Sequence, residues 1–366
     1  RGIAVANSLA TYASEEPAVD DVGNVIALFS HALVHRNQAP IVCLAHLDTV
    51  FERDTVLNAH YENTRVYCPG IGDNSRGLAA MITLARVLHG DRHTASRLRR
   101  PIEFVATVGE EGLGNLRGAQ AYFANRTAHN KPIPHAVLVL DGPGDENIVH
   151  HALGSRRYRI TFRGAGGHSW VDFGAPNAVH AAARAAAMLA DVPRHMHARV
   201  ALTVSGIGGG ESMNSIPANA WLDVDVRATE HATLTRVDVE LRNIVREAAQ
   251  SELSSDASRN FPRTFHNTTP LNTNIELLGE RPCGSLAVEH SLVQLAQAAS
   301  LRHGVEPVSA VASTDANIPL SLGIPAITIG AGGTGGGAHT LHEWYDNTHG
   351  SRGVARAFAI LAALAA

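Results

Sequence analysis

The chain has 366 residues, more than one ordinary hydrophobic core accommodates, so its length predicts two domains. Hydrophobic residues make up 45% and charged residues 17% of the chain, a composition that excludes an intrinsically disordered protein. The formal net charge of −4 argues against a nucleic-acid or anionic-membrane partner, and no apolar run is long enough to span a bilayer.

The three cysteines are single and widely spaced, at Cys43, Cys68 and Cys283, with no CxxC pair. This spacing indicates neither a cysteine–zinc site nor a disulfide framework. We interpret them as small core residues in a reducing compartment and expect a cytoplasmic location. The start at Arg1 resembles neither a signal peptide nor a normal initiator, so we expect that residues before it are missing, and a cleaved leader stays open.

In chain order, the first 153 residues alternate between strands and helices. Apolar runs typical of buried strands occupy residues 22–28, 40–45, 102–108 and 136–140. Apolar residues at helical spacing predict a helix over 77–88, which ends at Gly90. Such alternation predicts an α/β domain with a mostly parallel, doubly wound sheet.

The pattern changes near residue 154, where alternating apolar and polar residues predict half-exposed strands. The predicted elements are a strand at 157–163, a helix at 177–189, strands at 200–204 and 220–227, and a helix at 234–249. This order predicts a small α+β domain of the ferredoxin-like type over residues 154–265, inserted into the larger domain. Ser, Asn, Thr and Pro are frequent at 251–274, which predicts a return linker.

The larger domain is predicted to combine residues 1–153 with residues 266–366. Its second part contains a predicted helix at 286–303, a strand at 326–329 and a final helix that runs to Ala366. The glycine-rich stretch 330–335 matches GxGxxG, but further glycines rather than a helix follow it, so we interpret it as a loop and not as a dinucleotide site.

Ligands of open α/β sheets bind beyond the carboxyl ends of the strands, so the residues that follow the predicted strands are the candidates for chemistry. Five places in the larger domain carry a carboxylate or an imidazole there: His46-Leu47-Asp48, Asp73, Glu110-Glu111, Asp141 and His339. One coincidence would mean little in polar loops, but five at one sheet edge predict a shared site.

The mixture of imidazoles and carboxylates predicts two zinc ions per chain, each with nitrogen and oxygen ligands and an open position for water. We assign Asp73 as the carboxylate that bridges them, with His46 and Asp141 on one metal and Glu111 and His339 on the other. Cobalt and manganese stay open as alternatives to zinc.

Two further carboxylates complete the predicted catalytic group. Asp48, two residues after His46, is predicted to fix the tautomer of that imidazole. Glu110 lies beside a ligand without being one. We therefore assign it as the general base, which takes a proton from a metal-bridging water and passes it to the leaving amine.

Seven segments match a known family in order: AHLDTV (45–50), GIGDNSRG (70–77), GEEG (109–112), LDG (140–142), GAGGHS (164–169), NSIP (214–217) and HTLHE (339–343). Together they resemble the dinuclear zinc exopeptidases and deacylases, which include peptidase T, glutamate carboxypeptidase, acetylornithine deacetylase and succinyl-diaminopimelate desuccinylase. Each motif alone is weak, but the ordered set spans nearly the whole chain. The resemblance implies the ligand roles given above and a cis peptide after Asp73.

For the inserted domain, the resemblance implies a lid or dimerisation domain, and hence a homodimer. His168 would stabilise the tetrahedral oxyanion, often in the active site of the partner subunit. Asn214 and Arg227 match positions that contact the carboxylate or carbonyl oxygen of the substrate in relatives. The chain departs from many relatives at Asn74-Ser75, where they have Asp-Lys, and this changes the local charge. It also has Asp141 where Glu is common among deacylases and carboxypeptidases, and within the family this favours the aminopeptidase and dipeptidase branch.

We therefore predict a zinc-dependent exopeptidase that hydrolyses short peptides. One alternative with the same two-metal chemistry is a carboxypeptidase or an N-acyl-amino-acid deacylase. Another, of a different class, is a catalytically silent relative that binds peptides. Structural roles also stay open for several residues, as a solvated loop pair, a turn or a surface contact: Glu110, Glu111, Asp141, His168, Asn214 and Arg227.

Overall fold

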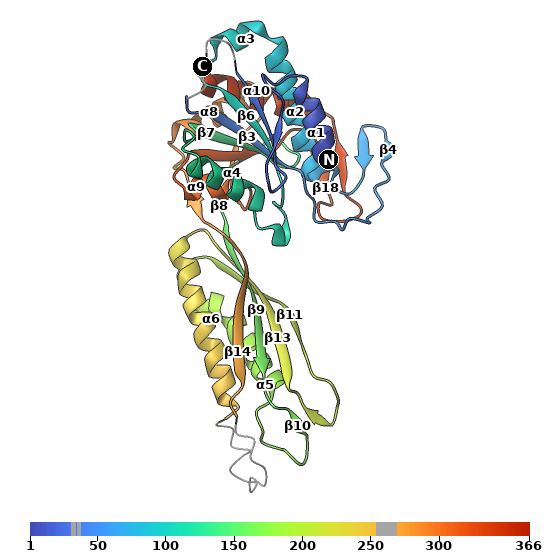
Figure 1. Cartoon of the computed structure of the whole chain (residues 1–366), viewed down its shortest axis with the longest axis vertical. Coiled ribbons are helices and arrows are strands. Elements are labelled where there is room, and N and C mark those ends of the chain that lie inside the picture. Colours follow the sequence, from blue (N-terminus) through green and yellow to red (C-terminus); the bar gives the residue numbers. More distant parts are fainter. Residues whose placement is uncertain (31–33, 35–37, 254–268) are drawn as a thin grey trace. The chain divides into compact units, whose positions relative to one another are not determined.

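The computed structural model describes residues 1–30, 34, 38–253 and 269–366 of the chain. The chain divides into two compact units (Figure 1). Unit 1 comprises Arg1–Ala152 and Gly284–Ala366, and unit 2 comprises Leu153–Cys283. The helices of the described residues include none that is both long and apolar enough to cross a membrane.

Unit 1 is built on a nine-stranded sheet whose centre is parallel. The central strands, in spatial order, are β6 (Ile102–Thr107), β3 (Ile41–His46), β7 (Ala136–Leu140) and β17 (Ala326–Ile329). Adjacent members of this set pair in parallel, which confirms the predicted mostly parallel sheet. Towards the edges, β2 (Val25–Phe29) pairs antiparallel with β6, and β8 (Asn147–Ala152) pairs antiparallel with β17.

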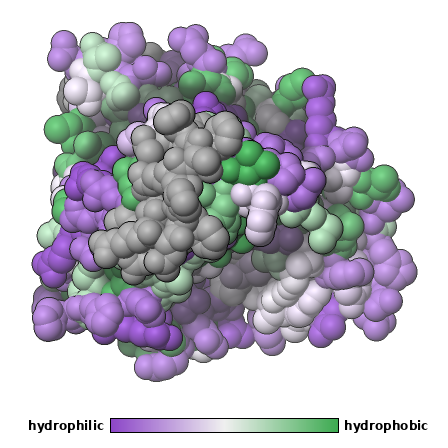
Figure 2. Space-filling view, turned by 90° about the horizontal axis from the view of Figure 1, so that it is seen from below, coloured by the Kyte–Doolittle hydropathy of each residue, from purple (hydrophilic) through white to green (hydrophobic). Residues whose placement is uncertain are grey.

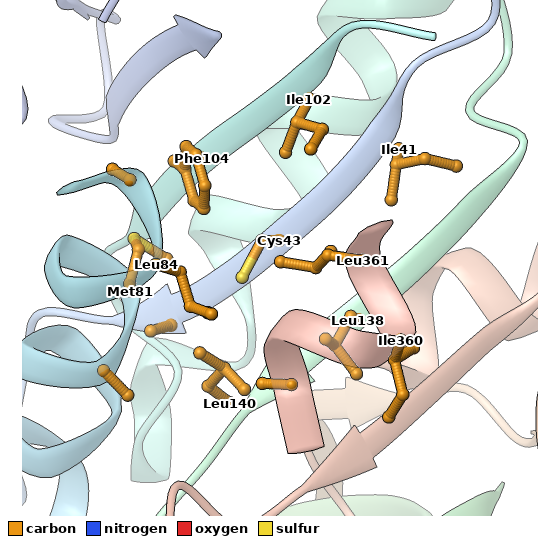
Figure 3. Packing of buried hydrophobic residues seen from close by; sticks show 14 of the residues in the cluster. Ile41, Cys43, Met81, Leu84, Ile102, Phe104, Leu138, Leu140, Ile360 and Leu361 are labelled. Carbon is orange, nitrogen blue, oxygen red and sulfur yellow. The ribbon is translucent and has the colours of Figure 1, made fainter. Parts of the chain in front are cut away.

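Helices cover both faces of this sheet, as the doubly wound prediction requires. One face carries α1 (Gly2–Ala10), α2 (Gly77–Gly90), α8 (Ser291–Arg302) and α10 (Gly350–Ala365). The other face carries α4 (Arg117–Ala128) and α9 (Asn317–Ser321). Figure 3 shows Cys43 and Phe104 of the sheet pointing at Met81 and Leu84 of α2, with Leu361 of α10 beside them. Because every central strand is buried on both faces, these strands read as continuous apolar runs.

A second, four-stranded sheet in unit 1 has no counterpart among the predicted elements. Its strands are β4 (His60–Glu62), β5 (Arg65–Tyr67), β18 (Thr334–Gly336) and β19 (Trp344–Asp346). The glycine-rich stretch at 330–335 does not open a helix, since α10 begins only at Gly350. From its sequence we interpret it as a loop, but its last two residues belong to β18. The link between β18 and β19 carries His339.

Unit 2 has the βαββαβ order of a ferredoxin-like domain, which confirms the predicted type. Its elements are β9 (Gly154–Arg163), α5 (Ala178–His195), β11 (Val200–Gly209), β13 (Asn219–Ala228), α6 (His231–Ser251) and β14 (Asn272–Arg281). The strands form an antiparallel sheet in the order β11-β13-β9-β14, and α5 and α6 pack on one of its faces. Seen from the lower end of Figure 1, hydrophilic residues dominate and hydrophobic residues form small separate patches (Figure 2).

The return from unit 2 to unit 1 lies later in the chain than the predicted boundary at 265/266. Asn272–Arg281 forms β14, which pairs with β9 over its whole length, so unit 2 continues to Cys283. The sequence obscured this strand because it is an edge strand with mostly exposed, polar residues. Residues 254–268 of the predicted linker lie outside the described residues. The first boundary, predicted at 153/154, lies at 152/153.

The remaining elements are short. They are β1 (Ala18–Val19), the π-helix η1 (Ile71–Arg76), α3 (Arg92–Arg97), the 3₁₀ helix η2 (Gly112–Gly114), β10 (Gly167–His168), β12 (Ser215–Ile216), β15 (Gly284–Ser285) and β16 (Val308–Ala312).

Candidate metal centre

The first half of the candidate site is built around His46, the last residue of β3, which is only 2% exposed. Its Nε2 lies 2.9 Å from Asp73 Oδ1 and 3.5 Å from Asp141 Oδ1. Its Nδ1 lies 3.2 Å from the carbonyl oxygen of Asp48, and because a carbonyl can only accept, Nδ1 carries a proton. Nε2, the nitrogen that faces the two carboxylates, therefore carries a lone pair in the neutral ring and a second proton in the charged ring.

The second half is built around His339, whose side chain is half exposed and whose backbone has a positive φ of 66°. Its Nε2 lies 3.1 Å from Asp73 Oδ2 and 3.1 Å from Glu111 Oε1. The two carboxylate oxygens of Asp73 thus face different imidazoles, and each imidazole has a further carboxylate of its own. The structure brings the five predicted ligands together in two groups that share Asp73.

The donor atoms of this cluster fit a divalent metal. One donor atom each from His46, Asp73 and Glu111 lie within 4.8 Å of one another, so the two groups of ligands lie next to each other around Asp73. Asp73 Oδ1 is buried, and although His46 Nε2 is 2.9 Å away, it accepts no well-aligned hydrogen bond from the described residues. A buried carboxylate oxygen without a donor is costly, and a cation held between it and an imidazole removes that cost.

The carboxylate of Asp48 makes a different contact from the predicted one. It lies 3.8 Å from His46 Nδ1, and the main-chain carbonyl of the same residue orients the imidazole instead. The two carboxylate oxygens accept hydrogen bonds from the backbone N–H groups of Glu110, at 3.1 Å, and Glu111, at 3.0 Å. Asp48 therefore fixes the turn after β6 that carries both glutamates.

Glu343 is a buried residue that holds the backbone of the turn carrying Asp73. The sequence reasoning gave it no role of its own. It is 1% exposed, and its carboxylate accepts the backbone N–H groups of Gly70, at 2.5 Å, and of Gly72 and Asp73, each at 2.8 Å. This cradle fixes the turn that presents the Asp73 side chain. The peptide bond between Asp73 and Asn74 is cis, as the family resemblance implied.

Replacing Glu343 by alanine is expected to destabilise the metal-free protein by about 3 kcal/mol or more, because three backbone N–H groups would lose their acceptor. Urea unfolding of the metal-free protein measures this. The matched control is Glu62→Ala, which removes an exposed glutamate of the same unit and should change stability by less than about 0.5 kcal/mol. Equal unfolding midpoints for the two variants would show that the cradle contributes nothing.

The charges of the site shift the pKa values of its members. Burial disfavours protonation of His46, but the adjacent carboxylates of Asp141 and Asp73 outweigh it and raise the pKa of the imidazole well above its usual value. Burial raises the pKa of the Glu111 carboxyl, and the nearby charge of Asp73 adds to this. The carboxyl of Asp73 is also buried, but His46 and His339 together lower its pKa.

Metal uptake is therefore expected to weaken as the pH falls. The raised pKa means that the metal-free His46 keeps a second proton into the neutral range, and a metal must displace it. Below that pKa the affinity should fall about tenfold per pH unit for the one displaced proton. Competition with a chromophoric zinc chelator at about pH 6 and about pH 8, corrected for protonation of the chelator, measures it. The same affinity at both pH values would contradict the expectation.

His168 and Asn214, two of the three predicted site residues of unit 2, lie in loops that contact each other. His168 Nδ1 accepts hydrogen bonds from the backbone N–H groups of Trp170, at 3.2 Å, and Val171, at 3.3 Å. This arrangement leaves Nε2 as the protonated nitrogen of the neutral ring. The carbonyl of Asn214 accepts the backbone N–H of Ser169 at 3.0 Å, so the loops that carry His168 and Asn214 are joined.

Arg227 is the third predicted residue of unit 2. It lies on β13, its side chain is 40% exposed, and its Nε donates to Asp225 Oδ2 at 2.7 Å. Its guanidinium therefore already has an anionic partner within the unit.

The fold and the cluster of imidazoles and carboxylates define a metal-dependent hydrolase of the two-unit α/β type. Residues 42–365 match peptidase family M20/M25/M40, and the chain belongs to this family. Among curated proteins, none matches the sequence.

Solved structures share the fold at low sequence identity. Aminopeptidase PepT from Bacillus cereus is 19% identical, with a TM-score of 0.76 over 100% of this chain and 92% of that one. A tripeptidase from Staphylococcus aureus is 16% identical, with a TM-score of 0.75 over 98% and 91%. The YXEP protein from Bacillus subtilis, described as a dinuclear metal-binding peptidase, is 14% identical, with a TM-score of 0.67 over 100% and 91%.

Proposed function

We propose that this chain is a zinc-dependent exopeptidase that hydrolyses the amide bond of short peptides. The observation that carries the proposal is the carboxylate of Asp73, whose two oxygens lie 2.9 Å and 3.1 Å from different imidazoles. One bridging carboxylate between two groups of ligands is typical of two-metal hydrolases.

Two sets of residues would hold the metals. His46 and Asp141 with Asp73 Oδ1 form the first set, and His339 and Glu111 with Asp73 Oδ2 form the second. When bound, zinc ions lower the pKa of a bound water and polarise a carbonyl oxygen.

Glu110 is the proposed general base. It is 5% exposed, its backbone N–H is fixed by Asp48, and its charge contributes to the raised pKa of His46, so it lies within the electrostatic reach of the site. Its carboxylate would accept a proton from the attacking water and return it to the leaving amine.

His168 is the proposed donor to the developing oxyanion. Because its Nδ1 accepts two backbone N–H groups, its Nε2–H is the free donor of the neutral ring. A donor aimed at developing negative charge is a large term in acyl transfer.

Replacing His168 by alanine should lower kcat by about 10²- to 10³-fold with the metals retained, since an oxyanion donor is lost. Steady-state kinetics with metal analysis on the same sample measures both. The matched control is His180→Ala, an exposed histidine on α5 of the same unit, which should keep the wild-type kcat. A wild-type kcat in His168→Ala would rule out the oxyanion role.

Three features support peptides as the substrate class. The family is a peptidase family, and two of its structural neighbours are an aminopeptidase and a tripeptidase by name. The ligand at position 141 is aspartate rather than glutamate, which favours the aminopeptidase and dipeptidase branch. We also propose, from the family resemblance, a homodimer assembled through unit 2. The three free cysteines support a cytoplasmic location.

The test is elemental analysis of the purified protein, followed by chelation and zinc re-addition with a panel of dipeptides, tripeptides and N-acyl amino acids. We expect about two zinc ions per chain and chelator-sensitive cleavage of the peptides. Cleavage of N-acyl amino acids alone would replace the exopeptidase by a deacylase. A folded protein that binds no metal and cleaves nothing would overturn the proposal in favour of a silent peptide-binding relative.

A further inference from the structure

A second buried layer of polar residues lies directly behind the metal centre. Side chains two apart on a strand share a face, so His46 continues the row of Leu44, and Thr107 continues the row of Val105. Leu44 and Val105 belong to the core between the sheet and the α4–α9 side. The parallel register pairs His46 with Thr107, so these two polar residues end the same buried face next to each other.

Asp315 reaches this layer from the turn before α9. It is 1% exposed, and the hydroxyl of Thr107 donates to its Oδ2 in a short hydrogen bond. Its Oδ1 is buried and accepts no hydrogen bond from the described residues. Among the same residues, no lysine or arginine forms an ion pair with it. In the sequence, Thr314-Asp315 follows a predicted core segment, which places it among candidates for the lining of the pocket but gives it no catalytic role.

The carboxylate of Asp315 lies within the electrostatic reach of His46, Asp141 and Asp48. Burial raises its pKa to about 6 in the metal-free chain. A buried carboxylate with one oxygen unsatisfied destabilises a fold unless a positive charge compensates it. Among the groups that act most strongly on Asp315, His46 is the one that can carry a positive charge, and the cations of the proposed metal centre would bind at His46.

We propose that Asp315 is a positioning residue of the metal centre, whose buried carboxylate, held by Thr107 behind His46, increases the affinity of the site for divalent metal. The inference rests on the proposed two-metal site. On this inference, the poorly satisfied carboxylate does not stabilise the metal-free fold, and its contribution appears as a higher affinity for metal. Residues behind the direct ligands of a metal commonly change its affinity by about 10- to 100-fold.

The test is Asp315→Asn, which keeps the shape and an acceptor for the Thr107 hydroxyl but removes the charge. Zinc affinity, measured by chelator competition without any peptide, is expected to fall about 10- to 100-fold. The thermal midpoint of the metal-free protein should stay the same or rise. The matched control is Asp91→Asn, since Asp91 also accepts a threonine hydroxyl, from Thr94 at 2.6 Å, but caps α3. It should leave zinc affinity unchanged.

A second variant keeps the inference testable if Asp315→Asn does not fold. Thr107→Val keeps the carboxylate but removes the hydroxyl that orients it, and a smaller loss of zinc affinity is expected. Wild-type affinity in a folded Asp315→Asn variant, or a loss of affinity accompanied by a lower midpoint of the metal-free protein, would overturn the inference. If the wild-type protein itself binds no zinc, the proposed metal centre fails and the inference fails with it. Wild-type zinc binding that is equal in Asp315→Asn overturns the inference alone.

Discussion

Glu110→Gln is expected to lower kcat by about 10²- to 10⁴-fold while the protein keeps both zinc ions. The amide has nearly the shape of the carboxylate but cannot accept the proton of the attacking water. The residue is buried beside the cluster, and its backbone N–H is held by Asp48, which the substitution leaves in place. Metal analysis and single-turnover kinetics on the same sample separate loss of chemistry from loss of metal.

The neighbouring glutamate provides the control. Glu111 Oε1 lies 3.1 Å from His339 Nε2, so Glu111→Gln should weaken the binding of one metal. The two adjacent substitutions thus differ in their effect on metal content. Glu110→Gln keeps two zinc ions and loses turnover, whereas Glu111→Gln loses metal. If Glu110→Gln keeps most of its rate, the proton acceptor is another group. If it loses zinc as Glu111→Gln does, Glu110 is a ligand.

The sequence predicts those site residues that lie at the ends of strands. His46, Glu110 and Asp141 lie at or within three residues of the carboxyl ends of β3, β6 and β7, and parallel strands with a common direction end at the same sheet edge. A local signal, the end of a strand, is therefore sufficient to bring residues nearly a hundred positions apart into one cluster.

The contacts that sequence reasoning did not predict are non-local. Glu343 contacts backbone more than 270 residues earlier in the chain, at Gly70 and Gly72, and Asp315 contacts Thr107 across 208 positions. The Asp48 carboxylate was assigned to the nearest histidine in sequence, but the turn after β6 offers it two backbone N–H groups. The polar sequence of β14 does not indicate a strand, and it forms one because it pairs with β9.

Asp73→Ala is expected to remove both metals and to reduce hydrolysis to the uncatalysed background. Each carboxylate oxygen of Asp73 serves a different half of the cluster, at 2.9 Å from His46 Nε2 and 3.1 Å from His339 Nε2. The backbone of the turn should stay in place, because Glu343 holds it through N–H groups that the substitution does not touch. Equilibrium dialysis against buffered zinc, followed by elemental analysis and circular dichroism, measures metal content and folding together.

His339→Ala is the matched variant for this experiment. It leaves His46, Asp141 and Asp73 Oδ1 intact, so it should bind one zinc ion at an affinity close to that of the wild type and lose the other. The number of metals lost then identifies what Asp73 does. Loss of two in Asp73→Ala against one in His339→Ala requires a shared ligand. Loss of one in both variants would mean that Asp73 serves a single metal, and the close approach of its Oδ1 to His46 would then be an ordinary imidazole–carboxylate pair.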